Sequence, residues 1–166
     1  AGGEGRALLS VAAVCGDLEQ FTQGLTLVAE ALAIFEASGD VDGSAHGLLV
    51  QGQLHHIGDE REPAKDCYEE ASRLFVGLED PLGNARACQG LGGILMLDLE
   101  HEKAIAAYRS ALFLFRDLEQ KVEQALCCHR MGEIHGLLAE YSEALSRYEE
   151  GRELFGQVEE VCGEAQ

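Results

Sequence analysis

Residues 85–115 read ARACQGLGGILMLDLEHEKAIAAYRSALFLF, and this stretch recurs at a fixed spacing of 40 residues. Positions 125–155 read ALCCHRMGEIHGLLAEYSEALSRYEEGRELF, and positions 45–75 read AHGLLVQGQLHHIGDEREPAKDCYEEASRLF. Residues 5–35 form a weaker copy. An internal repeat of this length without gaps is typical of solenoid proteins, in which successive units stack on one another.

Four positions are shared between the copies. A phenylalanine closes every copy, three copies carry a tyrosine seven residues earlier, and two further positions hold small residues. The aligned sets are Phe35, Phe75, Phe115 and Phe155; Val28, Tyr68, Tyr108 and Tyr148; Ala12, Gly52, Gly92 and Gly132; and Gly24, Ala64, Ala104 and Ala144. We expect the tyrosines and phenylalanines to be buried between neighbouring units.

Each unit contains two helical segments. Within residues 101–118, Ala104, Tyr108, Ala111 and Phe115 follow at spacings of three and four, which places an apolar stripe on one helical face. Helices are expected at about 6–16, 21–37, 44–57, 61–78, 82–97, 101–118, 122–138 and 141–158. Short turns force neighbouring helices to be antiparallel. The sequence therefore predicts an all-α solenoid of four antiparallel helical hairpins.

We expect residues 1–166 to form a single array, with repeats at about 5–42, 43–82, 83–122 and 123–162. Residues 163–165 align with 83–85, so the sequence stops where a fifth unit would begin. Neither end carries an obvious capping helix, which such arrays need for solubility. The expectation is that the natural protein extends further in at least one direction.

The chain carries 30 acidic and 12 basic residues, for a formal net charge of −18. This charge repels nucleic-acid backbones and anionic membranes, which argues against both as main partners. The acidity serves solubility, or alternatively it selects basic partners. Six cysteines lack disulfide-like spacing, no apolar run approaches the roughly 20 residues of a membrane span, and no signal peptide is visible. Reduced thiols and a cytoplasmic location are expected.

Two clusters, His55-His56 and Cys127-Cys128-His129, could suggest a metal site. Consecutive residues on a helix point about 100° apart, so neither run can converge on one ion. No CxxC or HExxH motif is present, and the glycines at 90–93 lack the strand and the Lys-Ser/Thr of a phosphate loop. We expect no metal, no cofactor, no small-molecule substrate and no enzymatic activity. These glycines are expected to let helices approach closely or to shape the floor of a groove.

The repeated spacing is a large residue, x2, Leu-Gly, x2, an aromatic, and then Ala, x3, an aromatic. The fourth unit fills it with Cys128, Met131, Gly132, His135, Ala144 and Tyr148; the third with Cys88, Leu91, Gly92, Leu95, Ala104 and Tyr108; the second with Leu48, Gln51, Gly52, His55, Ala64 and Tyr68. Over nearly the whole chain this resembles the tetratricopeptide repeat (TPR) family. The resemblance implies a right-handed superhelix of hairpins, with aromatic residues packed between them.

The chain departs from the TPR pattern in two ways. Its period is 40 instead of about 34, and Val76, Arg116 and Gly156 stand where a closing proline is usual. We expect the extra residues to lengthen the second helix of each unit, as in the long-helix repeats of TPR–GoLoco adaptors and kinesin light chains, which this array resembles. HEAT and armadillo repeats also have periods near 40, but the Gly–x11–Ala–x3–Tyr spacing favours TPR.

The resemblance implies a binding groove on the concave face that the first helix of each unit lines. Its positions correspond here to Arg6, Leu9 and Ala13; His46, Leu49, Gln53 and His56; Arg86, Gln89, Gly93 and Met96; and Leu126, His129, Glu133 and Gly136. Only Glu133 is acidic, whereas many glutamates lie on the second helices and turns. A neutral to weakly basic groove suits an acidic or amphipathic peptide. The alternative is that Arg6 and Arg86 are ordinary solvated side chains.

These features predict a non-enzymatic protein-interaction module, a scaffold or adaptor that binds a protein or peptide partner in its groove. The Lys/Asn clamp by which chaperone-binding TPR domains hold a terminal carboxylate is absent, because its positions hold Leu9, Ala13, Leu49, Gln53, Gln89 and Gly93. One alternative is a regulatory or structural region packed against another domain of a larger protein. Another is an array that self-associates through its ends.

Overall fold

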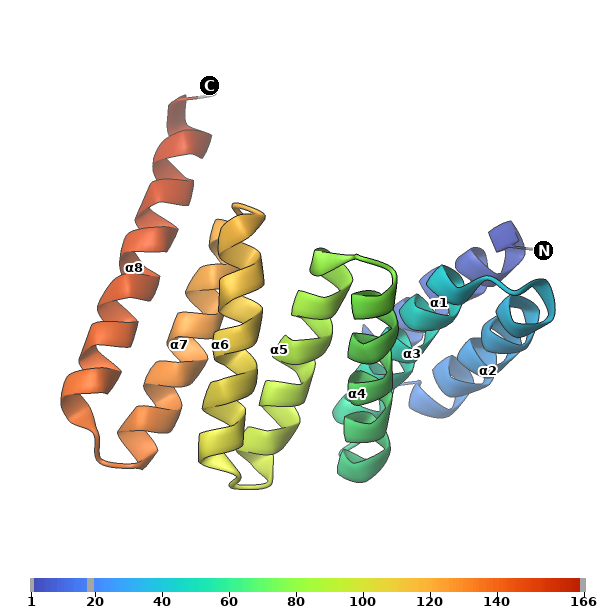
Figure 1. Cartoon of the computed structure of the whole chain (residues 1–166), viewed down its shortest axis with the longest axis horizontal. Helices are drawn as coiled ribbons and strands as arrows, with labels where there is room; N and C mark the ends of the chain where they lie inside the picture. The colour runs from blue at the N-terminus through green and yellow to red at the C-terminus, as the bar shows by residue number, and fades with distance from the viewer. Residues whose placement is uncertain (1, 18–19, 165–166) are drawn as a thin grey trace.

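The computed structural model describes residues 2–17 and 20–164, and these residues form eight helices joined by short turns (Figure 1). The helices are α1 (Gly2–Asp17), α2 (Phe21–Ser38), α3 (Val41–Ile57), α4 (Arg61–Gly77), α5 (Pro81–Leu97), α6 (His101–Asp117), α7 (Lys121–Leu137) and α8 (Tyr141–Glu164). No strand occurs in the described ranges. The predicted solenoid of four antiparallel hairpins is confirmed.

The hairpins stack in chain order, so that α1 and α2 lie at one end of the molecule and α8 at the other (Figure 1). Each second helix packs against its own partner and against the first helix of the next hairpin, as α4 does with α3 and α5. First helices also touch across repeats, α1 with α3 and α3 with α5. The core is therefore continuous along the stack, as in other repeat proteins.

Every described turn places one residue in the left-handed region, with φ between 55° and 68°. These residues are Gly39, Asp59, Glu79, Leu99, Glu119 and Ala139, each 20 positions after the last. The next amide donates to a carbonyl five residues back, as Glu100 does to Leu95 at 2.9 Å, which satisfies the end of the helix. The two helices of each central unit are equally long, because α3 to α6 all have 17 residues, whereas α2 has 18 against 16 in α1 and α8 has 24 against 17 in α7.

Four helices, α1, α3, α5 and α7, begin earlier than the sequence predicted, and an aspartate caps two of them, α3 and α5. Asp40 Oδ1 accepts from the amide of Gly43 at 2.8 Å, and Asp80 Oδ1 accepts from those of Leu82 and Gly83 at 3.0 and 3.1 Å. An aspartate at this position satisfies amides that have no partner within the helix. Pro81 then suits the first position of α5.

Rings from each second helix fill the joint between hairpins. Phe35, Phe75 and Phe115 are fully buried, and Tyr68 and Tyr108 nearly so, as predicted. At the first two joints, a glycine of the next first helix leaves room for the phenylalanine ring. A Cβ built on Gly43 would lie 2.3 Å from the ring of Phe35, and one built on Gly83 equally close to the ring of Phe75.

The prediction of burial is wrong for the last repeat. Tyr148 is 38% exposed and Phe155 is 40% exposed. The equivalent rings of α4 and α6 are covered by α5 and α7, whereas no described helix packs on the outer face of α8. Sequence identity at a repeat position therefore does not ensure burial, which also depends on a neighbour.

Tyr108→Ala should lower the free energy of unfolding by about 3–5 kcal/mol, because it empties a packed aromatic site. Tyr148→Ala is the matched control, since it removes the same atoms from the same repeat position at an exposed site. We expect a clearly smaller loss there. Chemical denaturation followed by circular dichroism measures both, and equal losses would contradict the burial difference.

The left-handed turns predict opposite effects at two equivalent positions. A residue other than glycine in this conformation lowers the stability of the fold by roughly 1–2 kcal/mol. Replacing it with glycine recovers only part of this, because glycine also makes the unfolded chain more flexible. Leu99 is 73% exposed, so its side chain contributes little packing. Leu99→Gly should stabilise the fold by about 0.5–1 kcal/mol, and Gly39→Ala should destabilise it by about 1 kcal/mol. Thermal unfolding midpoints moving the same way in both variants would refute this.

Candidate functional site

A concave hollow of about 500 Å³ lies on the face of the first helices, and we call it the central hollow. Side chains of α3, α5 and α7 form its walls, and Tyr68 of α4 and Tyr108 of α6 form its floor. Its lining residues are Gln53, His56, Tyr68, Arg86, Gln89, Gly90, Gly93, Met96, Leu97, Tyr108, Glu123, Leu126 and Arg130. Seven of the proposed groove positions meet here: Gln53, His56, Arg86, Gln89, Gly93, Met96 and Leu126.

The remaining groove positions lie elsewhere. Leu49 is only 5% exposed and Leu9 is also buried, so both are core residues, and the expected apolar groove contact from Leu49 is wrong. The sequence analysis placed Leu9 and Leu49 in the groove because they share a repeat position with Gln89 and His129. That position is buried in the first two units and partly or fully exposed in the last two. His129 and Glu133 do not border the central hollow.

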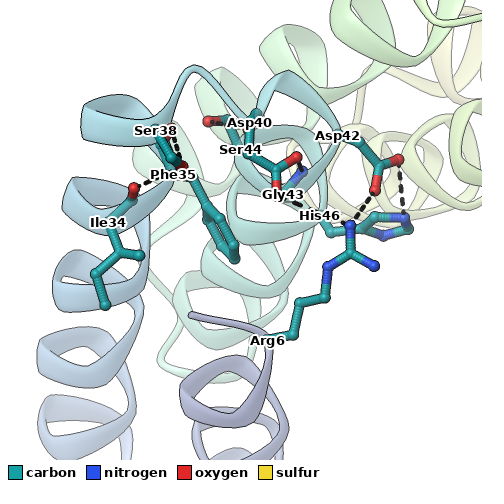
Figure 2. Close-up of polar contacts among 9 residues, drawn as sticks. All are labelled: Arg6, Ile34, Phe35, Ser38, Asp40, Asp42, Gly43, Ser44 and His46. Carbon is teal, nitrogen blue, oxygen red and sulfur yellow. Dashed lines mark hydrogen bonds and ion pairs between the residues drawn. The ribbon is translucent and has the colours of Figure 1, made fainter. Parts of the chain in front are cut away.

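Arg6 and His46 line a separate hollow of about 360 Å³ near the start of the array, and both contact one carboxylate (Figure 2). Arg6 extends from α1 and donates to Asp42 Oδ2 of α3 at 3.0 Å. His46 Nε2 lies 3.7 Å from the other oxygen of Asp42, and its ring meets the edge of Phe75 with centroids 5.0 Å apart. Asp42 neutralises this end of the face, which the sequence analysis did not foresee.

The charges around the central hollow are mixed. Arg130 Nη1 donates to Glu133 at 2.9 Å, and His129 Nε2 lies 3.5 Å from the same carboxylate. Glu123 also borders the hollow. The expectation of an almost acid-free groove is therefore wrong. The sequence could have indicated Glu123, because a glutamate stands there at a repeat position that is glycine in the two preceding units, Gly43 and Gly83.

Arg86 differs from the arginines around it. It is exposed at the wall of the central hollow, and it makes no ion pair with any carboxylate that the structure describes. Its neighbour Gln89, by contrast, has a partner within the protein, because the side-chain amide of Gln89 donates to Cys127 Sγ of α7 at 3.9 Å. Arg86 therefore presents a positive charge that is not ion-paired within the described residues.

Glycines let the nearly buried rings of Tyr68 and Tyr108 reach the lining of the hollow. A Cβ on Gly90 would lie 2.5 Å from the ring of Tyr68, and one on Gly93 would lie 3.6 Å from the hydroxyl oxygen of Tyr108. Burial raises the pKa of both hydroxyls, that of Tyr108 to about 12. Both tyrosines stay protonated at neutral pH, so each can donate a hydrogen bond to a ligand oxygen.

His56 stands between the polar wall and this floor. Its ring meets the edge of Tyr68 with centroids 6.4 Å apart. Burial lowers the pKa of His56, the positive charge of Arg130 lowers it further, and Asp59 opposes both effects. The imidazole is therefore neutral at neutral pH, with one nitrogen to donate and one to accept.

The reactive residue types of the chain are arranged for packing. His55 Nδ1 lies 2.5 Å from Glu60, and His135 Nδ1 lies 2.6 Å from Glu140, so each histidine joins the end of one helix to the start of the next. Over the part of the chain that the structure describes, no three His, Cys, Asp or Glu side chains are grouped to hold a metal ion. Nor does any described helix combine the length and apolarity needed to cross a bilayer.

The five described cysteines are free, and burial raises the pKa of four of their thiols, those of Cys67, Cys88, Cys127 and Cys128. Burial raises the pKa of Cys67 and of Cys128 to about 11 and that of Cys127 to about 12. The environments of Cys88 and Cys128 differ, because Cys88 is partly exposed beside Ser72 and Asn84 whereas Cys128 is fully buried. Thiols with raised pKa values lack the thiolate that catalysis or metal binding requires.

Comparison with known proteins gives one family match. The family described as soluble NSF attachment protein, SNAP, matches residues 31–153. No relative was found among curated protein sequences. The family match is therefore the evidence of relationship, and the structural comparisons bear on the fold.

Solved structures share the fold at low sequence identity. A Rap protein complexed with Competence and Sporulation Factor has a TM-score of 0.88 and 16% identity, over 95% of this chain and 44% of the other. BtubC (BKLC) from P. vanneervenii has a TM-score of 0.84 and 14% identity, over 93% and 64%. A putative kinesin light chain of TPR-like repeats from Podosopora anserina has a TM-score of 0.58 and 9% identity, over 92% and 95%. The TPR-type fold is confirmed, and the chain spans less than two thirds of the first two structures.

A pH titration tests the environment of His56. We expect NMR to give His56 a pKa below 6.5, and Arg130→Gln to raise it, because that change removes a nearby positive charge. Because the folded pKa is below the unfolded one, the unfolded chain binds more protons as pH falls through about 6.5. The free energy of unfolding should therefore decrease as the pH is lowered from about 6.5 to the pKa of His56 in the folded protein.

His56→Gln should remove this contribution to the pH dependence of stability. Arg109→Gln, which removes a charge from α6 outside the hollow, is the control and should leave the pKa of His56 unchanged. A His56 pKa above 6.5 in the unmodified protein would contradict the assignment.

Proposed function

Because the chain belongs to the soluble NSF attachment protein family of TPR-type helical repeats, we propose that it is a non-enzymatic interaction scaffold. In this proposal the central hollow binds an acidic or amphipathic segment of a partner protein. Helical solenoids present extended concave surfaces of this kind to their partners. The Rap structure, solved with Competence and Sporulation Factor, supports a binding role for the fold in that protein.

The observation that carries the proposal is Arg86. In a chain of net charge −18, the cationic side chains bordering this hollow are Arg86 and Arg130, and Arg130 already pairs with Glu133. Arg86 is left to pair with a carboxylate from outside. A guanidinium binds a carboxylate with two parallel hydrogen bonds, which gives direction as well as charge attraction.

Polar and apolar groups both line the hollow. Gln53 and His56 of α3 and Arg86 of α5 are polar, while Met96 and the exposed Leu126 offer apolar contacts. One exposed ion pair contributes only about 0–1 kcal/mol, so affinity must come from several such contacts together. A segment with acidic groups on one side and apolar groups on the other matches this arrangement.

The non-enzymatic part of the proposal is supported by the thiols and histidines described above. The buried cysteines have raised pKa values, and His55 and His135 are engaged with glutamates. The free thiols also suit a reducing compartment, and we propose the cytoplasm as the site of action. For the whole protein, we likewise propose a protein partner and a role without catalysis.

Charge reversal at Arg86 tests the groove. The probe is a fluorescein-labelled amphipathic helical peptide with glutamates on its polar face, compared with the same peptide carrying lysines. Arg86→Glu should weaken binding of the acidic peptide by roughly tenfold at low salt and by less at high salt, because salt screens the attraction. Fluorescence anisotropy measures both dissociation constants.

Arg109→Glu is the matched control. Arg109 is an exposed arginine of α6 that also forms no ion pair within the described residues, so the variant has the same net charge without altering the hollow. It should bind like the unmodified protein. Equal weakening by both variants would show that only net charge matters, and binding of the lysine peptide in preference to the acidic one would overturn the proposed partner chemistry.

A further inference from the structure

A second hollow, of about 390 Å³, adjoins the central hollow, and we call it the apolar hollow. It lies between α1 and α3, which supply most of its lining. No lysine, arginine, aspartate or glutamate is among the described residues that line it, in contrast to the central hollow. The residues that give it its apolar character are Ala13, Gly16, Val50, Leu54 and Ile57.

Small residues of α1 keep the apolar hollow open. A Cβ built on Gly16 would lie 3.1 Å from Leu54 Cδ2 and 3.5 Å from Ile57 Cδ1, so glycine leaves the side chains of α3 accessible here. Ile57 is 52% exposed as a result of its position at the rim. Burial of this apolar surface by a ligand side chain is favourable, because it removes that surface from water.

The two hollows are connected. Gln53, His56 and Tyr68 line both of them, so a ligand that occupies both must cross these residues. The side chains of Gln53 and His56 each offer a hydrogen-bond donor and an acceptor. An extended peptide needs such partners for its backbone groups, whereas a helix pairs these groups internally. The connection between the hollows therefore suits an extended segment.

The helix register sets the distance between the apolar hollow and Arg86. The equivalents of Leu54 and Ile57 in α5 are Ile94 and Leu97, eight and eleven residues after Arg86. This separation is roughly 12–16 Å along a helix, and the axes of packed helices such as α3 and α5 lie roughly 8–10 Å apart. The direct path is therefore roughly 14–19 Å, which about four to six extended residues span.

We propose that the two hollows form one peptide site, in which an extended segment of the partner protein is held at two points. A bulky apolar side chain of the segment occupies the apolar hollow. A carboxylate four to six residues away pairs with Arg86, and the backbone between them crosses Gln53 and His56. This inference rests on the function proposed above and adds the feature that distinguishes one acidic segment from another, since a buried apolar anchor contributes selectivity that an exposed ion pair does not.

The probe is a fluorescein-labelled peptide of glycine and serine that carries one phenylalanine and one glutamate five residues apart, made in both orders. Fluorescence anisotropy gives its dissociation constant. Replacing the phenylalanine with alanine should weaken binding roughly tenfold, as expected for losing one buried apolar side chain. A peptide with the same two residues only two positions apart should bind equally weakly, because it cannot span both hollows.

Two variants alter the apolar hollow alone. Ile57→Gln removes an apolar contact at a half-exposed site, and Ala13→Phe fills the hollow from an exposed position of α1. Both should weaken binding of the phenylalanine peptide severalfold and leave binding of the alanine peptide unchanged. Leu137→Gln is the matched control, because Leu137 has the same repeat position as Ile57, is 68% exposed and borders neither hollow. It should bind both peptides like the unmodified protein.

Methyl NMR locates the phenylalanine directly. Its aromatic ring shifts the resonances of methyl groups that it contacts, so the phenylalanine peptide should shift those of Val50 and Ile57. The alanine peptide should not. Ile134, which is fully buried in α7, serves as the reference and should not shift with either peptide.

The outcomes separate this inference from the function on which it rests. If Arg86→Glu weakens binding but Ile57→Gln, Ala13→Phe and the loss of the phenylalanine have no effect, the apolar hollow is not part of the site and the proposed function stands. If Ile57→Gln weakens binding but Arg86→Glu does not, the joined site is overturned together with the proposed preference for acidic segments. Absence of binding of every peptide to the unmodified protein would overturn both proposals.

Discussion

The architecture depends on the close contact between a phenylalanine ring of one helix and a glycine of the next. Phe35 and Phe75 close their second helices and lie against Gly43 and Gly83 at the start of the following hairpin. The ring fixes both the distance between hairpins and their register, because a Cβ at either glycine would overlap it. In the fourth hairpin Glu123 takes this position while Phe115 stays fully buried, so that joint reaches the same burial with a different arrangement.

The fold was predictable because its determinants are local and repeated. The apolar stripes, the small residues and the aromatic positions all occur within 40-residue units, so the sequence alone predicted the helices and their hairpin order. The ends of α4 to α7 were predicted to within one residue. The left-handed turn residues that end these helices, such as Leu99 and Glu119, were not predicted, because their side chains do not indicate that conformation. The burial of Tyr148 was predicted wrongly, because burial requires a neighbour that the residue's own sequence does not specify.

The candidate site was predictable in outline only. Repeat register brought seven expected side chains to one hollow, but the register of a first helix gave no information on which of its residues face inward, and Leu49 was therefore misplaced. Charge partners come from sequence-distant segments, as Asp42 does for Arg6 across two helices. Of the two arginines that border the hollow, Arg130 pairs with Glu133 whereas Arg86 pairs with no described carboxylate, a difference that the sequence alone does not reveal.

The regular spacing of the turns limits how such a chain can change in length. Seventeen helical residues and three turn residues reverse the chain every 20 positions, so the backbone returns to an equivalent orientation every 40. One residue inserted within a helix would rotate every later side chain by about 100°, and would move rings such as Phe115 out of their joints. Gain or loss of whole hairpins avoids this rotation. Duplication and deletion of complete units are therefore the changes in length that evolution, or a protein engineer, can make without disrupting the packing.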